Sequence, residues 1–182
     1  MKTLIKLFAL AFLAMLCWNS ASAQTFKFGH VNSQELIFLT PDYDSAMVKF
    51  TAYQQNLEEQ FVEMQTEFQN KYAAFEKNMN SWTAAVLEAR QRELQELSQR
   101  TADFQQSAQQ ELQNMQAMLL NPVVEKVTET INRIGKEQGF TYIFDLASRA
   151  IPYHNPDQST DLMETLKRAL NIPLDKKLPI GQ

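Results

Sequence analysis

The most restrictive feature of the sequence is a long central stretch without helix-breaking residues. The 80 residues between Pro41 and Pro122 contain neither glycine nor proline. The whole chain of 182 residues has only 4 glycines, whereas glycine makes up about 7% of typical globular proteins. Gln, Glu, Ala, Leu, Met and Lys dominate the stretch, and all six favour helix. Such a chain can build few tight turns or phosphate-binding loops, so long helices must account for most of it.

Apolar residues recur through this stretch with helical spacing. In its first half, large apolar residues lie three or four positions apart and therefore trace one face of a helix. The second half repeats the pattern more weakly, with Arg90 and Thr101 as polar interruptions. The early steps of 3, 4 and 4 make an eleven-residue repeat, which predicts straight or slightly right-handed coiling. The first stripe consists of Phe50, Tyr53, Leu57, Phe61, Met64, Phe68, Tyr72, Phe75, Met79 and Trp82.

The stretch is too long to be a single helix with no partner in its own chain. An unbroken helix of this size would extend about 120 Å. A bend fits best within residues 78–83, because four of these six residues are Asn, Ser or Thr, which cap helices. Gln-rich composition is also typical of disordered segments, but the apolar stripe persists through the Gln residues. We predict an antiparallel helical hairpin over residues 44–120 with its tip near residues 78–83.

The flanking segments predict a small α+β body made of residues 24–43 and 121–182. Residues 26–31 and 139–145 have the composition of strands. Residues 150–153 form a third, edge strand in this interpretation, because their proline cannot donate to a strand ladder. The strands are distant in sequence and must pair with one another, so the predicted fold class is α+β with the hairpin inserted into the body.

Short helices complete the predicted body. One carries the apolar residues of 123–134 and ends before Gly139. The other runs from Asp161 to Leu170, with Asp161 and Glu164 in a capping-box relation. A core this small usually requires oligomerisation for stability. The apolar strand residues are therefore candidates for an oligomer core: Phe28, Val31, Ile143 and Phe144.

The first 23 residues have the pattern of a removable signal peptide. Two lysines precede an apolar run, and Ala21-Ser22-Ala23 matches the A-x-A cleavage pattern. The apolar run is shorter than the roughly 20 residues of a spanning helix, which argues against a membrane anchor. A bulky residue, Leu16, precedes Cys17, which argues against a lipoprotein. We expect a soluble exported chain that begins at Gln24 and has no transmembrane segment.

Removal of the signal would leave an acidic chain without cysteine. Residues 24–182 contain 15 Lys and Arg against 21 Asp and Glu, a net charge of −6. Nucleic-acid binding depends on phosphate neutralisation, so we expect no nucleic-acid partner. Only His30 and His154 are present, and both are interpreted as structural or solvated. Nucleotide-binding and nucleophile-elbow motifs are absent from the sequence, so we expect no enzyme, cofactor or metal.

Charged clusters in the central stretch are interpreted as solvated helix faces. Examples are Glu58-Glu59 and Arg90-Gln91-Arg92-Glu93. Mixed charges on a helix surface give modest support through pairs three or four residues apart.

The order of the segments resembles the Skp/OmpH family of periplasmic chaperones. The resemblance rests on Val31-Asn32-Ser33, the long helical hairpin, Tyr142-Ile143-Phe144-Asp145, Ala150-Ile151-Pro152-Tyr153 and Asp161 before a final helix. It implies a homotrimer whose body is shared between subunits. It also implies helical arms around a cavity that holds unfolded outer-membrane β-barrel proteins, without ATP. The acidic balance of this chain differs from the strongly basic enterobacterial member of the family.

The expected function is that of an ATP-independent periplasmic holdase. The alternative is a structural coiled-coil adaptor of the cell envelope that binds one folded partner. Fewer neighbours remain to bury apolar side chains at the tip of a hairpin, and Met and Trp suit adaptable apolar contacts. The candidates for client contact are therefore Phe75, Met79 and Trp82.

Overall fold

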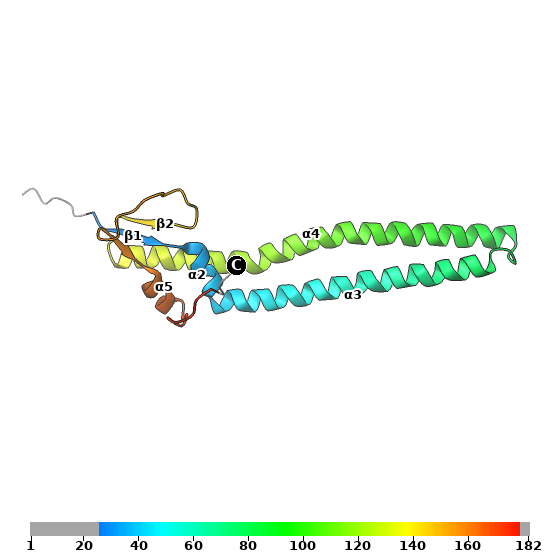
Figure 1. Ribbon diagram of the computed structural model, residues 1–182, viewed down its shortest axis with the longest axis horizontal. Helices are drawn as coiled ribbons and strands as arrows, with labels where there is room; N and C mark the ends of the chain where they lie inside the picture. Colours follow the sequence, from blue (N-terminus) through cyan, green and yellow to red (C-terminus); the bar gives the residue numbers. More distant parts are fainter. Residues whose placement is uncertain (1–25, 179–182) are drawn as a thin grey trace, which may run out of the picture.

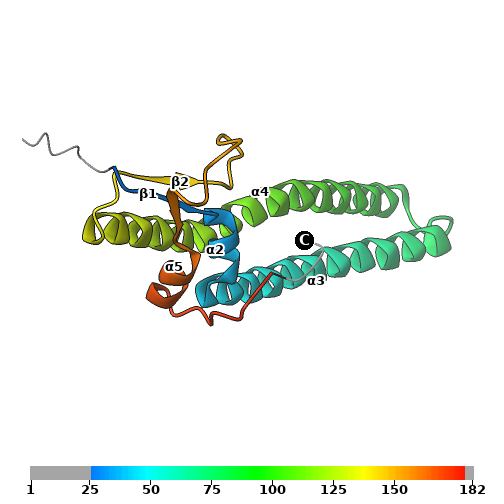
Figure 2. The same cartoon turned by 60° about the vertical axis from the view of Figure 1, so that its left-hand side comes forward.

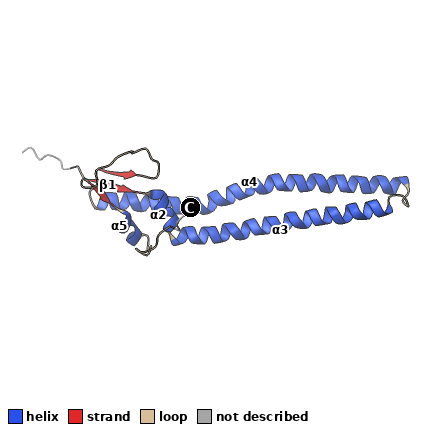
Figure 3. Ribbon diagram, in the orientation of Figure 1, coloured by secondary structure: helices blue, strands red, loops and turns tan. Residues whose placement is uncertain are grey.

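The computed structural model describes residues 26–178, so the predicted signal peptide and Gln24 lie outside the described residues. Two long helices form an arm, and a small sheet with shorter helices lies at one end of it (Figure 1). The α+β fold class is confirmed, and helix predominates over strand (Figure 3). The elements are β1 (Phe28–Val31), α2 (Ser33–Leu39), α3 (Pro41–Asn78), α4 (Ala84–Glu137), β2 (Tyr142–Asp145), β3 (Ser159–Asp161) and α5 (Met163–Ala169).

Local capping determines where the arm helices begin. Pro41 occupies the first turn of α3, where its missing N–H costs nothing. The Thr40 hydroxyl accepts a hydrogen bond from the Tyr43 amide at 3.1 Å. At the other end of the arm, Thr83 caps α4 and its hydroxyl faces the Val86 amide at 3.5 Å. The helices run antiparallel and are joined by a short turn after Asn78 (Figure 1).

Helix α4 does not end at Pro122, contrary to the sequence interpretation. It continues unbroken from the arm to Glu137 and includes the segment predicted as a separate helix. A proline inside a helix removes one backbone hydrogen bond and pushes on the preceding turn. Figure 1 shows α4 bending in its yellow-green part, near the sheet. The predicted boundary between arm and body, after residue 120, therefore falls inside a continuous helix. The division of the chain into an arm (44–120) and a body (24–43 and 121–182) stays a prediction.

The stripe that faces α4 also differs from the predicted one. Lys71, not Tyr72, occupies the inward position, and Tyr72 is 46% exposed. The Lys71 stem can line the interface while its ammonium reaches a carboxylate of α4. Tyr72 instead stacks beside Phe68, with ring centroids 6.1 Å apart. Beyond Phe68 the inward spacing alternates between three and four, so the eleven-residue repeat does not continue.

The sheet is wholly parallel, with strand order β2-β1-β3. Phe28 pairs with Tyr142 on one side and with Ser159 on the other. The prediction of an edge strand at 150–153 is wrong, because these residues lie in the loop between β2 and β3. Each residue of β3 has a backbone N–H that can donate to the open edge of β1, whereas Pro152 has no backbone N–H.

The final helix begins two residues later than predicted and without the expected capping box. Leu162 is the N-cap residue and makes no side-chain cap bond. Asp161 instead accepts a hydrogen bond from the Met163 amide at 2.8 Å. Asp161 belongs to β3, so its backbone is committed to the sheet, and the helix can start only after the chain leaves the strand.

One hydrophobic core joins the sheet to the short helices and to the last part of α4. Helices α2, α4 and α5 lie on the same side of the sheet (Figures 1 and 2). The core side chains come from β1, α2, α4, α5 and the segments that flank α5. They are Val31, Leu36, Leu39, Val127, Ile134, Leu162, Leu166, Leu170 and Ile172.

Gly29 permits the close approach of β1 to the core. A Cβ at this position would lie 3.0 Å from Leu162 Cδ1 and 3.0 Å from Phe140 Cε1. A Cβ at Gly135 in α4 would meet only Ile143 Cδ1, also at 3.0 Å. Ile143 is only half-buried, so its terminal methyl can move more easily than the fully buried Leu162 and the rigid Phe140 ring around Gly29.

We predict opposite outcomes for two alanine substitutions. Gly29→Ala should lower the free energy of unfolding by about 1–3 kcal/mol, because it overpacks the core. Gly135→Ala should be close to neutral, because about 0.5–1 kcal/mol of helix propensity offsets the shift of Ile143. Urea unfolding of both variants measures the difference, and equal destabilisation would contradict the packing described for Gly29.

Candidate functional site

The side of the sheet away from the helices carries a layer of aromatic rings, which we call the outer sheet face. It consists of Phe26, Phe28, Tyr142 and Phe144. The Phe28 ring lies 6.4 Å from Tyr142 and 6.0 Å from Phe144, with interplanar angles of 11° and 21°. Phe26 is 62% exposed and Tyr142 is 61% exposed. A contiguous apolar surface of this kind is typical of an interaction site.

The structure divides the four oligomer-core candidates between the two sides of the sheet. Val31 is 1% exposed and belongs to the core of the single chain, and Ile143 packs against that core. Phe28 and Phe144 point the other way, because side chains alternate along a strand. Only these two are therefore available on the outer sheet face.

Two histidines meet beside this face. The ring centroids of His30 and His154 are 4.3 Å apart. Nδ1 of His30 lies 2.9 Å from the hydroxyl of Ser159, which is buried. This contact ties β3 to β1, so His30 has a structural role at the strand junction. Within residues 26–178, no three His, Cys, Asp or Glu side chains gather closely enough to hold a metal ion.

Asp145 fastens the end of β2 to the start of α2. Its carboxylate accepts hydrogen bonds from the Ser33 amide at 3.1 Å, the Ser33 hydroxyl at 2.5 Å and the Ala147 amide at 3.0 Å. Partial burial acts to raise the pKa of Asp145, but the bonds from Ser33 and Ala147 outweigh it and lower the pKa below its ordinary value. This interaction joins two of the segments that carry the family resemblance.

The three candidates for client contact gather at the arm tip. Phe75 of α3 and Trp82 of the turn pack edge to face, with ring centroids 5.8 Å apart. Both are half-buried. Met79 follows the end of α3 and is 42% exposed. The tip therefore presents a flexible thioether beside an ordered aromatic pair.

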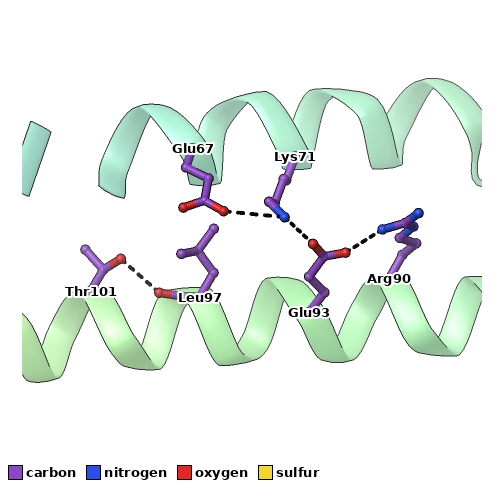
Figure 4. Close-up of polar contacts among 6 residues, drawn as sticks. All are labelled: Glu67, Lys71, Arg90, Glu93, Leu97 and Thr101. Carbon is purple, nitrogen blue, oxygen red and sulfur yellow. Dashed lines mark hydrogen bonds and ion pairs between the residues drawn. The ribbon is translucent and has the colours of Figure 1, made fainter. Parts of the chain in front are cut away.

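Below the tip, a charged cluster crosses the arm interior (Figure 4). Lys71 of α3 pairs with Glu93 of α4, and it also lies 3.4 Å from Glu67 one turn away. Arg90 donates to the other oxygen of Glu93 at 2.7 Å. The interpretation of Arg90 to Glu93 as a purely solvated face is therefore wrong for Glu93, which is half-buried and bridges the helices. The spacing of three from Phe68 places Lys71 on the inward face, and a lysine there requires a carboxylate on the facing helix. The sequence therefore contained this one indication of the cluster.

The cluster shifts the pKa values of both central groups. The hydrogen bond to Glu93 is the main reason that the pKa of Lys71 lies above its ordinary 10.5. Hydrogen bonds from Lys71 and then Arg90 lower the pKa of Glu93 below its ordinary 4.5. Both side chains remain more than one third exposed, so solvent and salt weaken the attraction.

Next to the cluster, Leu97 fills the space between the helices. It is 1% exposed, and Leu57 at 7% is the other deeply buried leucine of the arm. The hydroxyl of Thr101 donates to the Leu97 carbonyl at 2.8 Å (Figure 4). The polar interruption at Thr101 is thus satisfied within its own helix.

Polar contacts also fasten the arm near the sheet. Tyr53 donates to Glu111 across the hairpin at 2.6 Å. Lys126 of α4 reaches Asp42 at 2.5 Å. Between Tyr53 and Lys71, the described part of α3 makes no ion pair to α4. The arm is therefore fastened by polar contacts at its two ends and by apolar packing in its middle.

Comparison with known proteins agrees with this architecture. The family description "Outer membrane protein (OmpH-like)" matches residues 27–170. A solved structure from Caulobacter crescentus, described as a proposed outer membrane chaperone (OmpH-like), has a similar fold with a TM-score of 0.69. The two chains are 16% identical, and the similarity covers 86% of this chain and 94% of that chain. Among curated proteins, no match is found.

The small sheet with its short helices and the long pair of helices define an α+β protein with a helical arm. This chain belongs to the OmpH-like family, so the resemblance to Skp/OmpH chaperones is confirmed. The family is one of chaperones and is periplasmic in general. None of the helices in the described part of the chain combines the length and apolar character needed to cross a membrane.

The charged cluster predicts a pH dependence of arm stability. The folded pKa of Glu93 is lowered, so its contribution is complete above about pH 4.5 and is lost as the pH falls through the folded value. The folded pKa of Lys71 is raised, so its contribution is complete below about pH 10.5 and is lost above. Glu93→Gln should lower the Tm by a few degrees at most at pH 7, and this difference should shrink at pH 3.

Glu96→Gln is the matched control, because Glu96 is exposed on the same helix. Its Tm should change less at pH 7 than that of Glu93→Gln. Circular dichroism at both pH values measures the effect. A Glu93→Gln difference that persists undiminished at pH 3 would contradict the assigned role of the cluster.

Proposed function

We propose that this protein is an ATP-independent periplasmic holdase that binds unfolded outer-membrane β-barrel proteins and prevents their aggregation in transit. The single observation that carries the proposal is the arm itself, a hairpin of 38-residue and 54-residue helices. Its tip offers Met79 and the Phe75–Trp82 pair for apolar contact. Membership of a chaperone family supports the same conclusion.

The proposed assembly is a homotrimer held through the outer sheet face. The family resemblance supplies the number three, and the exposed rings of Phe26 and Tyr142 support the choice of surface. In this proposal, residues 24–43 and 121–182 form the body and residues 44–120 form the arm. Several arms in one assembly raise the effective concentration of weak binding sites around a client, which strengthens overall binding. Binding of the unfolded state lowers its free concentration and therefore slows aggregation.

Contact with clients should come mainly from burial of apolar groups at the tip. The mature chain would carry a net charge of −6, so broad attraction by a basic surface is not available. Attraction between exposed charges fades beyond about 8 Å at physiological ionic strength, whereas burial is little affected by salt. Suppression of aggregation should therefore change little between low and moderate salt.

We predict that replacing Met79 and Trp82 together with Ser weakens this suppression severalfold. The assay dilutes an unfolded outer-membrane barrel from urea and follows light scattering. Helix content and oligomeric mass should stay unchanged, because both residues lie outside the hairpin helices. If the protein bound a folded protein as tightly as the unfolded barrel, the result would favour the adaptor function instead. Suppression that collapses with salt and ignores the double substitution would contradict the role of the tip.

The two sides of the sheet predict different outcomes for charged substitutions. Phe144→Asp should dissociate the oligomer while the single chain keeps its helix content. Ile143→Asp should unfold the body as well, because it places a charge against α4 beside Gly135. Tyr153→Asp, in a loop and 77% exposed, is the control and should leave the mass unchanged. Light scattering and circular dichroism measure both properties, and a parent that is already a monomer would overturn the proposed assembly.

A further inference from the structure

The two histidines of the chain meet where the loop between β2 and β3 (residues 146–158) lies against the sheet. His30 belongs to β1, and His154 lies far along the chain, in this loop. Their ring centroids are 4.3 Å apart, and the ring planes are inclined at 44°. Both side chains are half-buried. Each titratable ring therefore has the other as its immediate neighbour.

Few other contacts hold the middle of the loop to the sheet. Among the described residues, the hydrogen bonds of residues 147–158 all have partners within residues 145–158. The core side chains of the described chain come from outside the loop. Figures 1 and 2 show the loop projecting on the side of the sheet opposite to α4 and α5. The ring contact of His154 therefore carries much of the attachment of the loop.

The charged groups nearest to the two rings do not pair with them. Beside His30, β2 presents the uncharged Phe144, and β3 presents Asp161. The Asp161 carboxylate accepts a hydrogen bond from a backbone amide at the start of α5, at 2.8 Å. The loop itself carries Arg149 and Asp157. In the described chain, none of these three charged groups forms an ion pair with a histidine.

The remaining titratable neighbours are tyrosines. Tyr142 lies on the outer sheet face, and Tyr153 precedes His154 in the loop. Tyrosine carries no charge until the pH approaches about 10. The charged groups of α4 and α5 lie on the other side of the sheet (Figure 2). A positive charge on both histidine rings would therefore lack a paired negative charge.

Protonation of both rings is unfavourable while they remain in contact. An isolated imidazole titrates near pH 6.5. Two positive charges about 4 Å apart repel each other, and partial burial limits the screening of that repulsion by water and salt. One ring can take up a proton while the contact persists, but uptake of the second proton is opposed. A released loop leaves both rings free, so the released state binds more protons than the attached state.

The direction of the pH dependence follows from this difference in bound protons. A state that binds more protons gains population as the pH falls. The attachment of the loop is therefore complete above about pH 6.5 and weakens below it. The junction of β1 and β3 is not weakened in the same way, because the Ser159 hydroxyl oxygen can accept a hydrogen bond from Nδ1 of a protonated His30. Release is consequently confined to the loop.

We propose that His30 and His154 form a pH-sensitive latch, which holds the β2–β3 loop on the sheet near neutral pH and releases it below about pH 6. The proposal is independent of the holdase function. It gives the two histidines a regulatory role in addition to the structural role of His30. Because the loop adjoins the outer sheet face, its release changes the surface next to Phe28 and Phe144.

Hydrogen exchange of the full mature protein, measured by mass spectrometry over residues 147–158, tests the latch. Division of the intrinsic exchange rate at each pH by the observed rate gives a protection factor. At pH 5.5 a free imidazole is about nine-tenths protonated, so the released state holds nearly one proton more than the attached state. The protection of the parent should therefore fall about fivefold between about pH 7.5 and about pH 5.5.

His154→Phe is the matched control, because it keeps an aromatic ring against His30 but cannot take up a proton. Its protection should change by less than about twofold over the same pH range. His154→Ala removes the ring, so its protection should be low at both pH values. Circular dichroism should show the same helix content for all three proteins at both pH values.

Three results would overturn the proposal. The first is a parent whose loop is equally protected at both pH values. The second is a loss of protection in His154→Phe as large as that in the parent, because another group would then be responsible. The third is a loss of helix content in the parent at the lower pH, because general unfolding would then explain the exchange.

Discussion

The continuity of α4 through Pro122 is the constraint on which the rest of the structure depends. The same helix pairs with α3 along the arm and then supplies Val127 and Ile134 to the core beneath the sheet. The direction of the arm is therefore fixed by the packing of the sheet, because no flexible linker separates them. Lys126 of α4, which reaches Asp42 of α3, strengthens the connection between the two helices.

The arm holds together with few deeply buried side chains. Leu57 and Leu97 are the buried leucines of its interior, and most of the other inward residues are only half-buried. Two helices alone cannot enclose a core, so each stripe keeps one edge in water. Polar contacts at both ends maintain the register that apolar packing leaves weakly specified. The middle of the arm is consequently held together mainly by apolar packing.

Features set by neighbouring residues were predictable from the sequence. The hairpin follows from the absence of glycine and proline and from the caps near Thr83, which act within one turn. The incorrect predictions concern residues whose structure depends on segments far away in the sequence. Strand β3 forms at Ser159 because β1 offers an open edge there, and no local pattern reveals that edge. The apolar spacing selects Tyr72 in place of Lys71, because the partner of Lys71, Glu93, lies on the other helix and is distant in sequence. Alternation along a strand already places Phe28 and Val31 on opposite faces of the sheet. Which of the two faces the helices cover depends on contacts between distant segments, so the sequence pattern could not assign it.

The parallel sheet has a consequence for the order in which the chain folds. Strand β1 lies at the centre of the sheet, yet both of its partners come from the far end of the chain, as the pairing of Phe28 with Tyr142 illustrates. The arm helices require only local contacts and can form in microseconds, whereas pairing across so long a loop is slow. A chain that emerges from its N-terminus must therefore complete its arm before its first strand can find a neighbour. Phe28 and Val31 of β1 stay in water throughout that interval, so this chain passes through the same exposed condition from which a holdase protects other chains.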